Sequence, residues 1–138
     1  MVTNLKGTKL ISVRLKKIDW NKRVASDLQF SFKSFIRPYW ENAIGVSEEF
    51  VIPKSGGLRI DLINFSSKVI FEISGKQHFS YCKFFHAGNP LNFAASIKRD
   101  CLKHDWAMLN GFSWGEVIES DIPLLSPDYI KKKFGIEI

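Results

Sequence analysis

Two acidic residues, Asp61 and Glu72, lie on consecutive hydrophobic runs of this chain. Carboxylates are the protein ligands that Mg²⁺ prefers, and two of them on paired strands can hold such a cation against a phosphate group. Glu72 lies inside the run V-I-F-E-I, where an unpaired carboxylate would be costly. The two residues are also consistent with a simpler role, because acids on neighbouring strands often keep a sheet edge soluble.

A β-hairpin is expected to position these two residues. The runs 58–65 and 68–74 are rich in β-forming residues and are joined by N-F-S-S, which predicts two strands and a tight connection. Side chains alternate along a strand, so Asp61 and Glu72 each point to one face of the hairpin. If those two faces coincide, the carboxylates meet.

Other predicted elements flank the hairpin. A strand with a basic outer face is predicted at 9–17, followed by a helix that begins at Asp19 and ends or bends at Pro38. On this helix Asn21 and Asp27 are polar residues predicted to point inward. The remaining predicted elements are a short strand at 50–52, a turn at 53–57, a functional loop at 75–92, a helix at 93–110 stopped by Gly111, a strand at 113–119 and a last helix at 126–134. The apolar stripe of the helix at 93–110 is predicted to consist of Phe93, Ile97, Cys101, His104 and Met108.

The order of these features resembles the PD-(D/E)xK nuclease superfamily. The residues that carry the resemblance are R-I-D at 59–61, F-E-I-S-G-K-Q-H at 71–78, R-D-C-L-K at 99–103 and L-N-G-F at 109–112. They are most similar to the branch of the very-short-patch-repair (Vsr-like) mismatch endonucleases and their homing endonuclease relatives. The resemblance implies a restriction-endonuclease-like α/β fold, with a mixed central sheet flanked by helices. It implies one domain over 1–138, with the core motifs at 58–119.

The resemblance also implies a metal-dependent nuclease site. In such a site Asp61 and Glu72 would hold Mg²⁺ or Mn²⁺, and His78 would act as an acid, a base or a phosphate contact. Asp100 and Lys103 would complete the site from the helix. Each of the last three also has a structural interpretation: His78 as a hydrogen-bonding residue beside a strand end, Asp100 in an intrahelical pair, and Lys103 as a solvated helix charge.

The chain departs from the family pattern in two places. The usual Lys two residues after the Glu is Ser74 here, and a hydroxyl cannot stabilise negative charge as an ammonium does. Lys76 lies on the same run and is a candidate substitute. The Glu that the family carries on its first helix is replaced by Asn21, with Asp19 and Asp27 nearby.

A second set of residues, Cys82, His86, Cys101 and His104, has the types that bind tetrahedral Zn²⁺. Its spacing is not that of an ordinary zinc finger, and two of the four fall on the apolar stripe of the predicted helix. Two interpretations are therefore open: a structural zinc site, or free thiols at both cysteines in a reducing compartment.

Composition favours a folded, basic protein. The chain has 138 residues, enough for one domain with a core, and 45% of them are hydrophobic. A net charge of +6 favours a polyanionic partner such as DNA. No apolar run approaches the roughly 20 residues of a membrane span, and no secretory signal opens the chain, so we expect an intracellular protein, cytoplasmic in its own cell or in a host cell if phage-encoded. The predicted DNA contacts are Arg14, Lys16, Lys22, Arg23, Lys98 and Arg99, and the aromatic residues Phe79, Tyr81, Phe84 and Phe85 either stack on bases or pack the loop.

We therefore expect a metal-dependent DNA endonuclease of the phage, homing or repair type. Cleavage of both strands would favour a homodimer, since one site normally serves one strand. Two alternatives stay open: a catalytically inactive nucleic-acid-binding module on the same fold, and a basic structural protein without nucleic-acid chemistry.

Overall fold

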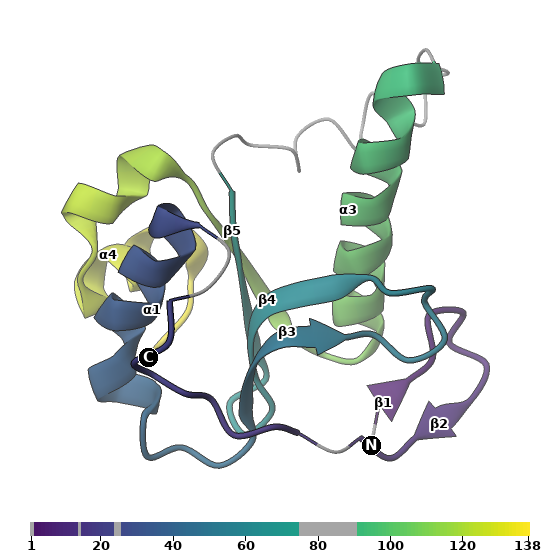
Figure 1. The fold of residues 1–138 in the computed structure, drawn as a ribbon, viewed down its shortest axis with the longest axis horizontal. Helices are drawn as coiled ribbons and strands as arrows, with labels where there is room; N and C mark the ends of the chain where they lie inside the picture. Colours follow the sequence, from purple (N-terminus) through teal and green to yellow (C-terminus); the bar gives the residue numbers. More distant parts are fainter. Residues whose placement is uncertain (1, 14, 24–25, 75–90) are drawn as a thin grey trace.

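Four strands form the central sheet of the protein, and helices cover both of its faces (Figure 1). The computed structural model describes residues 2–13, 15–23, 26–74 and 91–138, with the backbone alone for 91–97. In their order across the sheet, the strands are β3 (Val46–Val51), β4 (Arg59–Asn64), β5 (Val69–Ile73) and β6 (Ser113–Val117). β3 pairs antiparallel with β4, and β4 pairs antiparallel with β5, whereas β5 and β6 are parallel. The sheet is therefore mixed, as the resemblance implies.

The predicted hairpin between β4 and β5 is confirmed. The side chain of Asn64 accepts hydrogen bonds from the backbone N–H groups of Ser66 at 2.9 Å and Ser67 at 3.1 Å. Lys68 then adopts a left-handed conformation with φ 58°, which closes the turn. These local interactions set the register in which Ile63 of β4 lies opposite Ile70 of β5.

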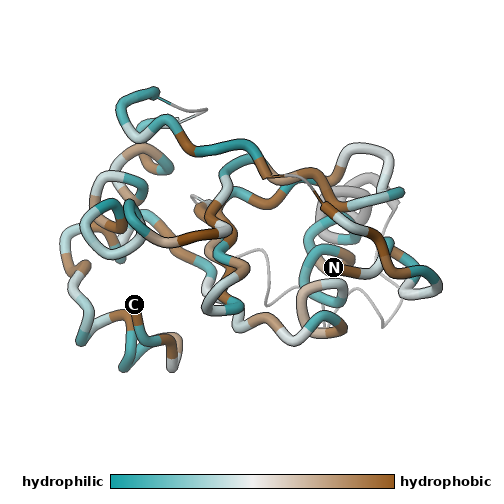
Figure 2. The backbone as a smooth tube through the Cα atoms, turned by 90° about the horizontal axis from the view of Figure 1, so that it is seen from below, coloured by the Kyte–Doolittle hydropathy of each residue, from teal (hydrophilic) through white to brown (hydrophobic). Residues whose placement is uncertain are grey.

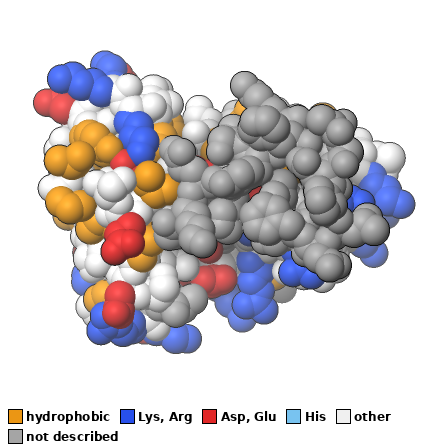
Figure 3. All heavy atoms as spheres, turned by 90° about the horizontal axis from the view of Figure 1, so that it is seen from above, with side chains coloured by type: hydrophobic (Ala, Val, Ile, Leu, Met, Phe, Trp, Pro, Cys, Tyr) orange, Lys and Arg blue, Asp and Glu red, His pale blue; other side chains and the backbone are white. Residues whose placement is uncertain are grey.

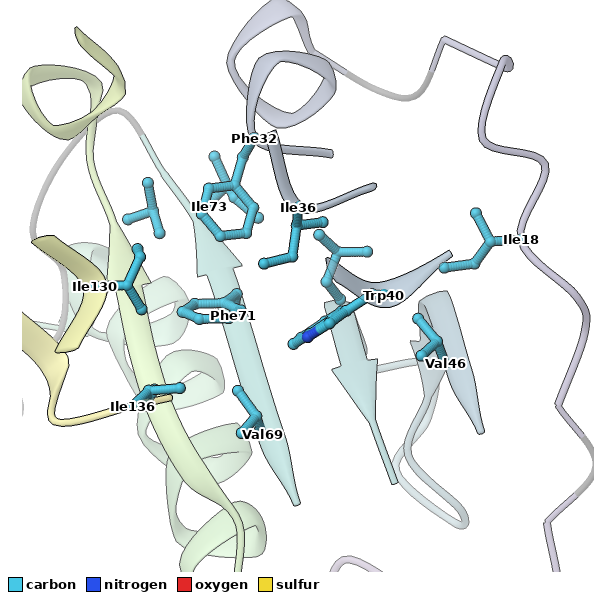
Figure 4. Close-up of a cluster of buried hydrophobic side chains, with 12 residues drawn as sticks. Ile18, Phe32, Ile36, Trp40, Val46, Val69, Phe71, Ile73, Ile130 and Ile136 are labelled. Atoms are coloured by element: carbon cyan, nitrogen blue, oxygen red, sulfur yellow. The ribbon is translucent and has the colours of Figure 1, made fainter. Parts of the chain in front are cut away.

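The two faces of the sheet pack against different helices. On β5, Phe71 packs with Phe32 of α1 (Asp27–Trp40) and Ile130 of α4 (Pro127–Phe134) in one core (Figure 4). Ile70, the residue before Phe71, belongs to the second core, with Trp106 of α3 (Leu91–Leu109). Figure 2 shows stretches of hydrophobic residues in the middle of the molecule, with further ones on the segments around it. The helices are α1 (Asp27–Trp40), α3 (Leu91–Leu109), α4 (Pro127–Phe134) and the 3-10 helix η2 (Glu119–Leu124).

The first helix begins later and ends later than the sequence predicts. Ser26 is its N-cap, with a side chain that accepts a hydrogen bond from Gln29 N at 3.1 Å. Asp19 instead accepts a hydrogen bond from Asn21 N at 3.1 Å and forms a separate turn. Pro38 lies inside α1, in its last turn, and the helix continues to the buried Trp40. The predicted helix start at Asp19 is therefore wrong, and of the two effects predicted for Pro38, an end or a bend, the end is excluded.

The predicted strand at 9–17 is also mostly wrong. Only β2 (Leu10–Ile11) forms, and it pairs antiparallel with β1 (Val2–Thr3) as a small second sheet. The strand predicted at 50–52 lies in the longer β3, which ends before Ile52. η2 was not predicted, because its E-S-D-I-P-L sequence carries neither a period of two nor a helical period.

The C-terminal half agrees better with the sequence. α3 covers most of the range predicted at 93–110, and Gly111 with φ 77° follows it. The buried residues of α3 include Cys101, Trp106 and Ala107, whereas Met108 of the predicted stripe is 45% exposed. β6 and α4 form as predicted, although β6 ends before 119. Within the described parts of the chain, every helix is too short or too polar to cross a lipid bilayer.

Candidate active site

Asp61 and Glu72 meet at the point where β4 and β5 separate. The backbone pairing of these strands includes Leu62 with Phe71 and would next pair Asp61 with Glu72. At this position side chains replace the backbone ladder: Asp61 N donates to Glu72 Oε2 at 3.0 Å, and Ile73 N donates to Asp61 Oδ2 at 2.9 Å. The structure therefore brings together the two carboxyl groups that the sequence singles out.

This carboxyl pair is largely withdrawn from solvent. Glu72 is 8% exposed, and Asp61 is partly buried. Burial, with the charge of Glu72 and a hydrogen bond to it, raises the pKa of Asp61 to about 9. The hydrogen bond from Ile73 N and the charge of Lys103 oppose this rise but do not cancel it. At neutral pH the pair therefore holds a proton that a cation would have to displace.

Lys103 of α3 supplies a positive charge to this pair. Its Nζ lies 2.9 Å from Glu72 Oε1 and 4.0 Å from Asp100 Oδ1, one helical turn earlier. Burial alone would lower the pKa of Lys103, but the charge and hydrogen bond of Glu72, with the charges of Asp61 and Asp100, raise it. The ammonium therefore stays charged, and it offsets the cost of burying a carboxylate.

Sequence reasoning missed one acidic residue beside the pair. Glu116 of β6 is the register partner of Glu72 of β5, and side chains at matched positions of neighbouring parallel strands lie on the same face. Glu116 is partly buried. A signal was present in the sequence, because Glu116 is the one charged residue between Trp114 and Val117 in a strand that the pattern predicts. That Glu116 lies beside Glu72 was not predictable without the pairing of β5 with β6.

The candidates for the first-helix residue of the site, Asn21 and Asp27, lie on the surface. Asn21 is exposed, and its side chain accepts a hydrogen bond from Arg37 Nη1 at 3.0 Å. Asp27 is exposed as well and pairs with Arg23. The predicted inward orientation of Asn21 and Asp27 is wrong, because the helix starts after Asn21 and turns Asp27 to the outside. Lys76 and His78 lie outside the described residues.

Half of the predicted zinc set can be located. Cys101 is 8% exposed, and the described part of the chain contains no free cysteine, so the predicted free thiol at Cys101 is wrong. The ring of His104 lies edge-on to Trp114, with 5.4 Å between centroids. Burial lowers the pKa of His104, although Asp105 opposes this effect. Cys82 and His86 lie outside the described residues.

Metal ligands are limited in the described regions. There, no three side chains of His, Cys, Asp or Glu are grouped so that they could hold a metal ion. Asp61 and Glu72 thus offer a two-carboxylate set, which suits Mg²⁺ because this ion usually keeps water and phosphate oxygens as its other ligands. Such a set does not suit structural Zn²⁺, which takes four protein ligands.

The predicted DNA contacts are mainly exposed. Lys16, Lys22, Lys98 and Arg99 are exposed, and Arg23 is exposed but pairs with Asp27. Arg14 lies outside the described residues, as do the four loop aromatics. Figure 3 shows Lys and Arg side chains at several places around the rim of one face, with Asp and Glu among them. The basic groups that this view shows therefore lie in separate places.

No protein-family model, curated protein or solved structure matches this chain.

Proposed function

We propose that this protein is a metal-dependent DNA endonuclease with a restriction-endonuclease-like fold, in which Asp61 and Glu72 hold Mg²⁺ or Mn²⁺. The observation that supports this most is the reciprocal bonding of the two side chains to the backbone where β4 and β5 separate. Acids that only keep a sheet edge soluble would point to water and leave the ladder intact. These two instead converge, and burial together with the charge of Glu72 raises the pKa of Asp61 to about 9.

The carboxylate pair fits the proposed cation. When bound there, Mg²⁺ or Mn²⁺ supplies positive charge against the scissile phosphate and favours ionisation of a water molecule. Asp61 releases its proton as it becomes a ligand, and Glu72 provides the second carboxylate. Exposed basic residues hold the phosphates on either side, which sets affinity rather than sequence preference.

Lys103 supplies the positive charge that is missing at Ser74, the position of the family's usual Lys. Ser74 is partly buried directly after the end of β5, and its backbone N–H donates to Val117 O at 2.8 Å. Its hydroxyl carries no charge, whereas the ammonium of Lys103 reaches the same carboxylate from α3. A positive charge fixed beside Glu72 stabilises negative charge that develops on a phosphate held by this pair. In this proposal Lys103, rather than a residue of β5, supplies the ammonium of the site.

Plasmid cleavage tests the proposal. We expect the purified protein to convert supercoiled DNA to nicked or linear DNA with Mg²⁺ or Mn²⁺ and not with a chelator. Asp61→Asn and Glu72→Gln keep the shape of each side chain and should each lower the rate by about a hundredfold or more. Glu119→Gln is the matched control, because it removes an exposed acid on η2 and should cleave like the wild type.

A nucleic-acid-binding module without catalysis is the second candidate. The favouring observation is that the protein itself already bonds both oxygens of Glu72, through Lys103 Nζ and Asp61 N. Under this alternative, DNA binding weakens steeply with salt, no divalent cation supports cleavage, and Asp61→Asn binds DNA as the wild type does. Folded wild-type protein that binds but never cuts would replace the nuclease proposal with this one.

A further inference from the structure

β3 contains a backbone conformation that strands normally exclude. Glu49 lies in the middle of β3 with φ 51°. The other non-glycine residues with positive φ in the described regions, Lys54 and Lys68, lie in turns. A left-handed conformation is unfavourable for a residue with a Cβ and persists only where the surrounding structure holds it.

The conformation of Glu49 interrupts the pairing of β3 with β4 opposite Asp61. Backbone pairs join Glu48 to Leu62 and Phe50 to Ile60, but the intervening position, Glu49 opposite Asp61, is skipped. On β4, Asp61 N also turns to the Glu72 side chain instead of a β5 carbonyl. Asp61 thus lies where regular pairing fails toward both neighbouring strands, and β3 and β4 bend away from β5 in Figure 1.

The packing of the strands shows that β3 and β4 turn over at this point. In a regular strand Val46 and Phe50 would point to the same face, because side chains alternate with a period of two. Val46 instead packs in the core beside α1, whereas Phe50 packs in the core beside α3. On β4, Leu62 and Ile60 divide between the two cores in the same way.

α1 holds two consecutive residues of β3. Gln29, 4% exposed, donates from Nε2 to Glu49 Oε1 at 3.0 Å. Lys33, fully buried, places Nζ 2.9 Å from Glu48 Oε2. Adjacent side chains of a regular strand point to opposite faces, so one helix can bind both only if the strand is twisted between them.

We infer that Gln29 and Glu49 are positioning residues, which hold the turn of β3 and thereby free Asp61 to bond with Glu72 and Ile73. The geometric part of this inference is independent of catalysis. Its consequence for cleavage rests on the proposed function. Gln29 and Glu49 act through Asp61 and are not placed in contact with the substrate.

Amide hydrogen exchange measured by NMR tests the inference without any cleavage assay. The reporters are the N–H groups of Asp61 and Ile73, which the two carboxyl groups accept. The reference is Ser113 N, which donates to Lys68 O at 2.8 Å at the other end of the sheet. In Gln29→Ala we expect the reporters to exchange about tenfold faster relative to the reference, the size of one lost hydrogen bond to a charged group.

A rescue variant separates positioning from general loss of stability. Glycine adopts positive φ without a partner, so Gln29→Ala combined with Glu49→Gly should return the reporters to near the wild-type ratio. Glu49→Val, which disfavours positive φ, should accelerate them, whereas Lys54→Val, at a turn position with φ 57°, should not. Unchanged reporters in Gln29→Ala, or a double variant as fast as Gln29→Ala, would overturn the inference.

The plasmid assay on the same variants then links geometry to activity. The variants whose Asp61 and Ile73 N–H groups exchange faster should also cleave DNA more slowly. If the exchange pattern holds but the wild type cuts no DNA, the positioning role stands and the proposed nuclease function fails.

Discussion

Lys103 Nζ of α3 lies 2.9 Å from Glu72 Oε1 of β5, with both side chains mostly withdrawn from water. This contact joins the helix to the sheet at the candidate site. It also explains how a glutamate can remain among the buried residues of β5, because an ammonium neutralises it.

Removing this ammonium should destabilise the protein. In Lys103→Met the Glu72 carboxylate loses its charged partner, and we expect a loss of about 2 to 3 kcal/mol in the free energy of unfolding, measured with urea. The control is Lys98→Met, an exposed lysine of the same helix, which should change stability by less than about 0.5 kcal/mol. Glu72→Gln combined with Lys103→Met should recover part of the loss, since no buried charge is then left alone. Equal free energies of unfolding for Lys103→Met and Lys98→Met would contradict a stabilising role of this ion pair.

Metal affinity should rise with pH. Since the pKa of Asp61 is raised to about 9, a cation competes with its proton below that pH. Between pH 6 and 8 the affinity for Mn²⁺ should increase about tenfold per pH unit, with release of about one proton per ion at pH 7. Calorimetry in buffers of different ionisation enthalpy measures both quantities. An affinity that stays flat over this range would show that Asp61 is not a ligand that exchanges a proton.

Asp61 should also affect stability in the absence of metal. Its pKa in the folded state, about 9, lies above the ordinary value of 3.8, so the folded protein binds more protons between these values. The contribution of Asp61 to stability is therefore fully present below pH 3.8 and is lost as pH rises toward 9. Asp61→Asn cannot titrate, so its stability should fall less than that of the wild type between pH 5 and 9. Denaturant unfolding in a chelator, at several pH values, provides the comparison.

Asp121 should have the opposite pH dependence. Its buried carboxylate accepts hydrogen bonds from Ile118 N at 2.9 Å, from Tyr129 Oη and from Lys133 Nζ. Burial would raise the pKa of Asp121, but these hydrogen bonds and the charge of Lys133 together lower it. Its contribution is therefore present above pH 3.8 and is lost as pH falls through the lowered value.

Asp121→Asn should cost about 3 kcal/mol near pH 7, because it weakens a buried charged network that holds η2 to α4. The difference from the wild type should shrink below pH 4. Asp128→Asn, an exposed acid of α4, is the control and should show neither effect. A constant difference between pH 3 and 7 would rule out titration of Asp121 as the cause.

Local sequence signals determined much of this fold. The N-F-S-S connection with Lys68 sets the β4–β5 hairpin, Gly111 follows the end of α3, and Ser126 with Pro127 starts α4. Each of these signals acts over a few residues, through a cap, a turn or a permitted φ. The register that places Asp61 opposite Glu72 belongs to the same class, because the hairpin turn sets it.

Tertiary structure decided the rest of the candidate site. The contact of Lys103 with Glu72, the register of Glu116 with Glu72, and the conformation of Glu49 held by Gln29 all join residues from different elements. The start of α1 belongs with these, since Asp19 and Ser26 are both suitable caps and the local pattern does not choose between them. Burial and long-range pairing determine these contacts and the start of α1. Both depend on which surfaces meet after the helices and strands have formed.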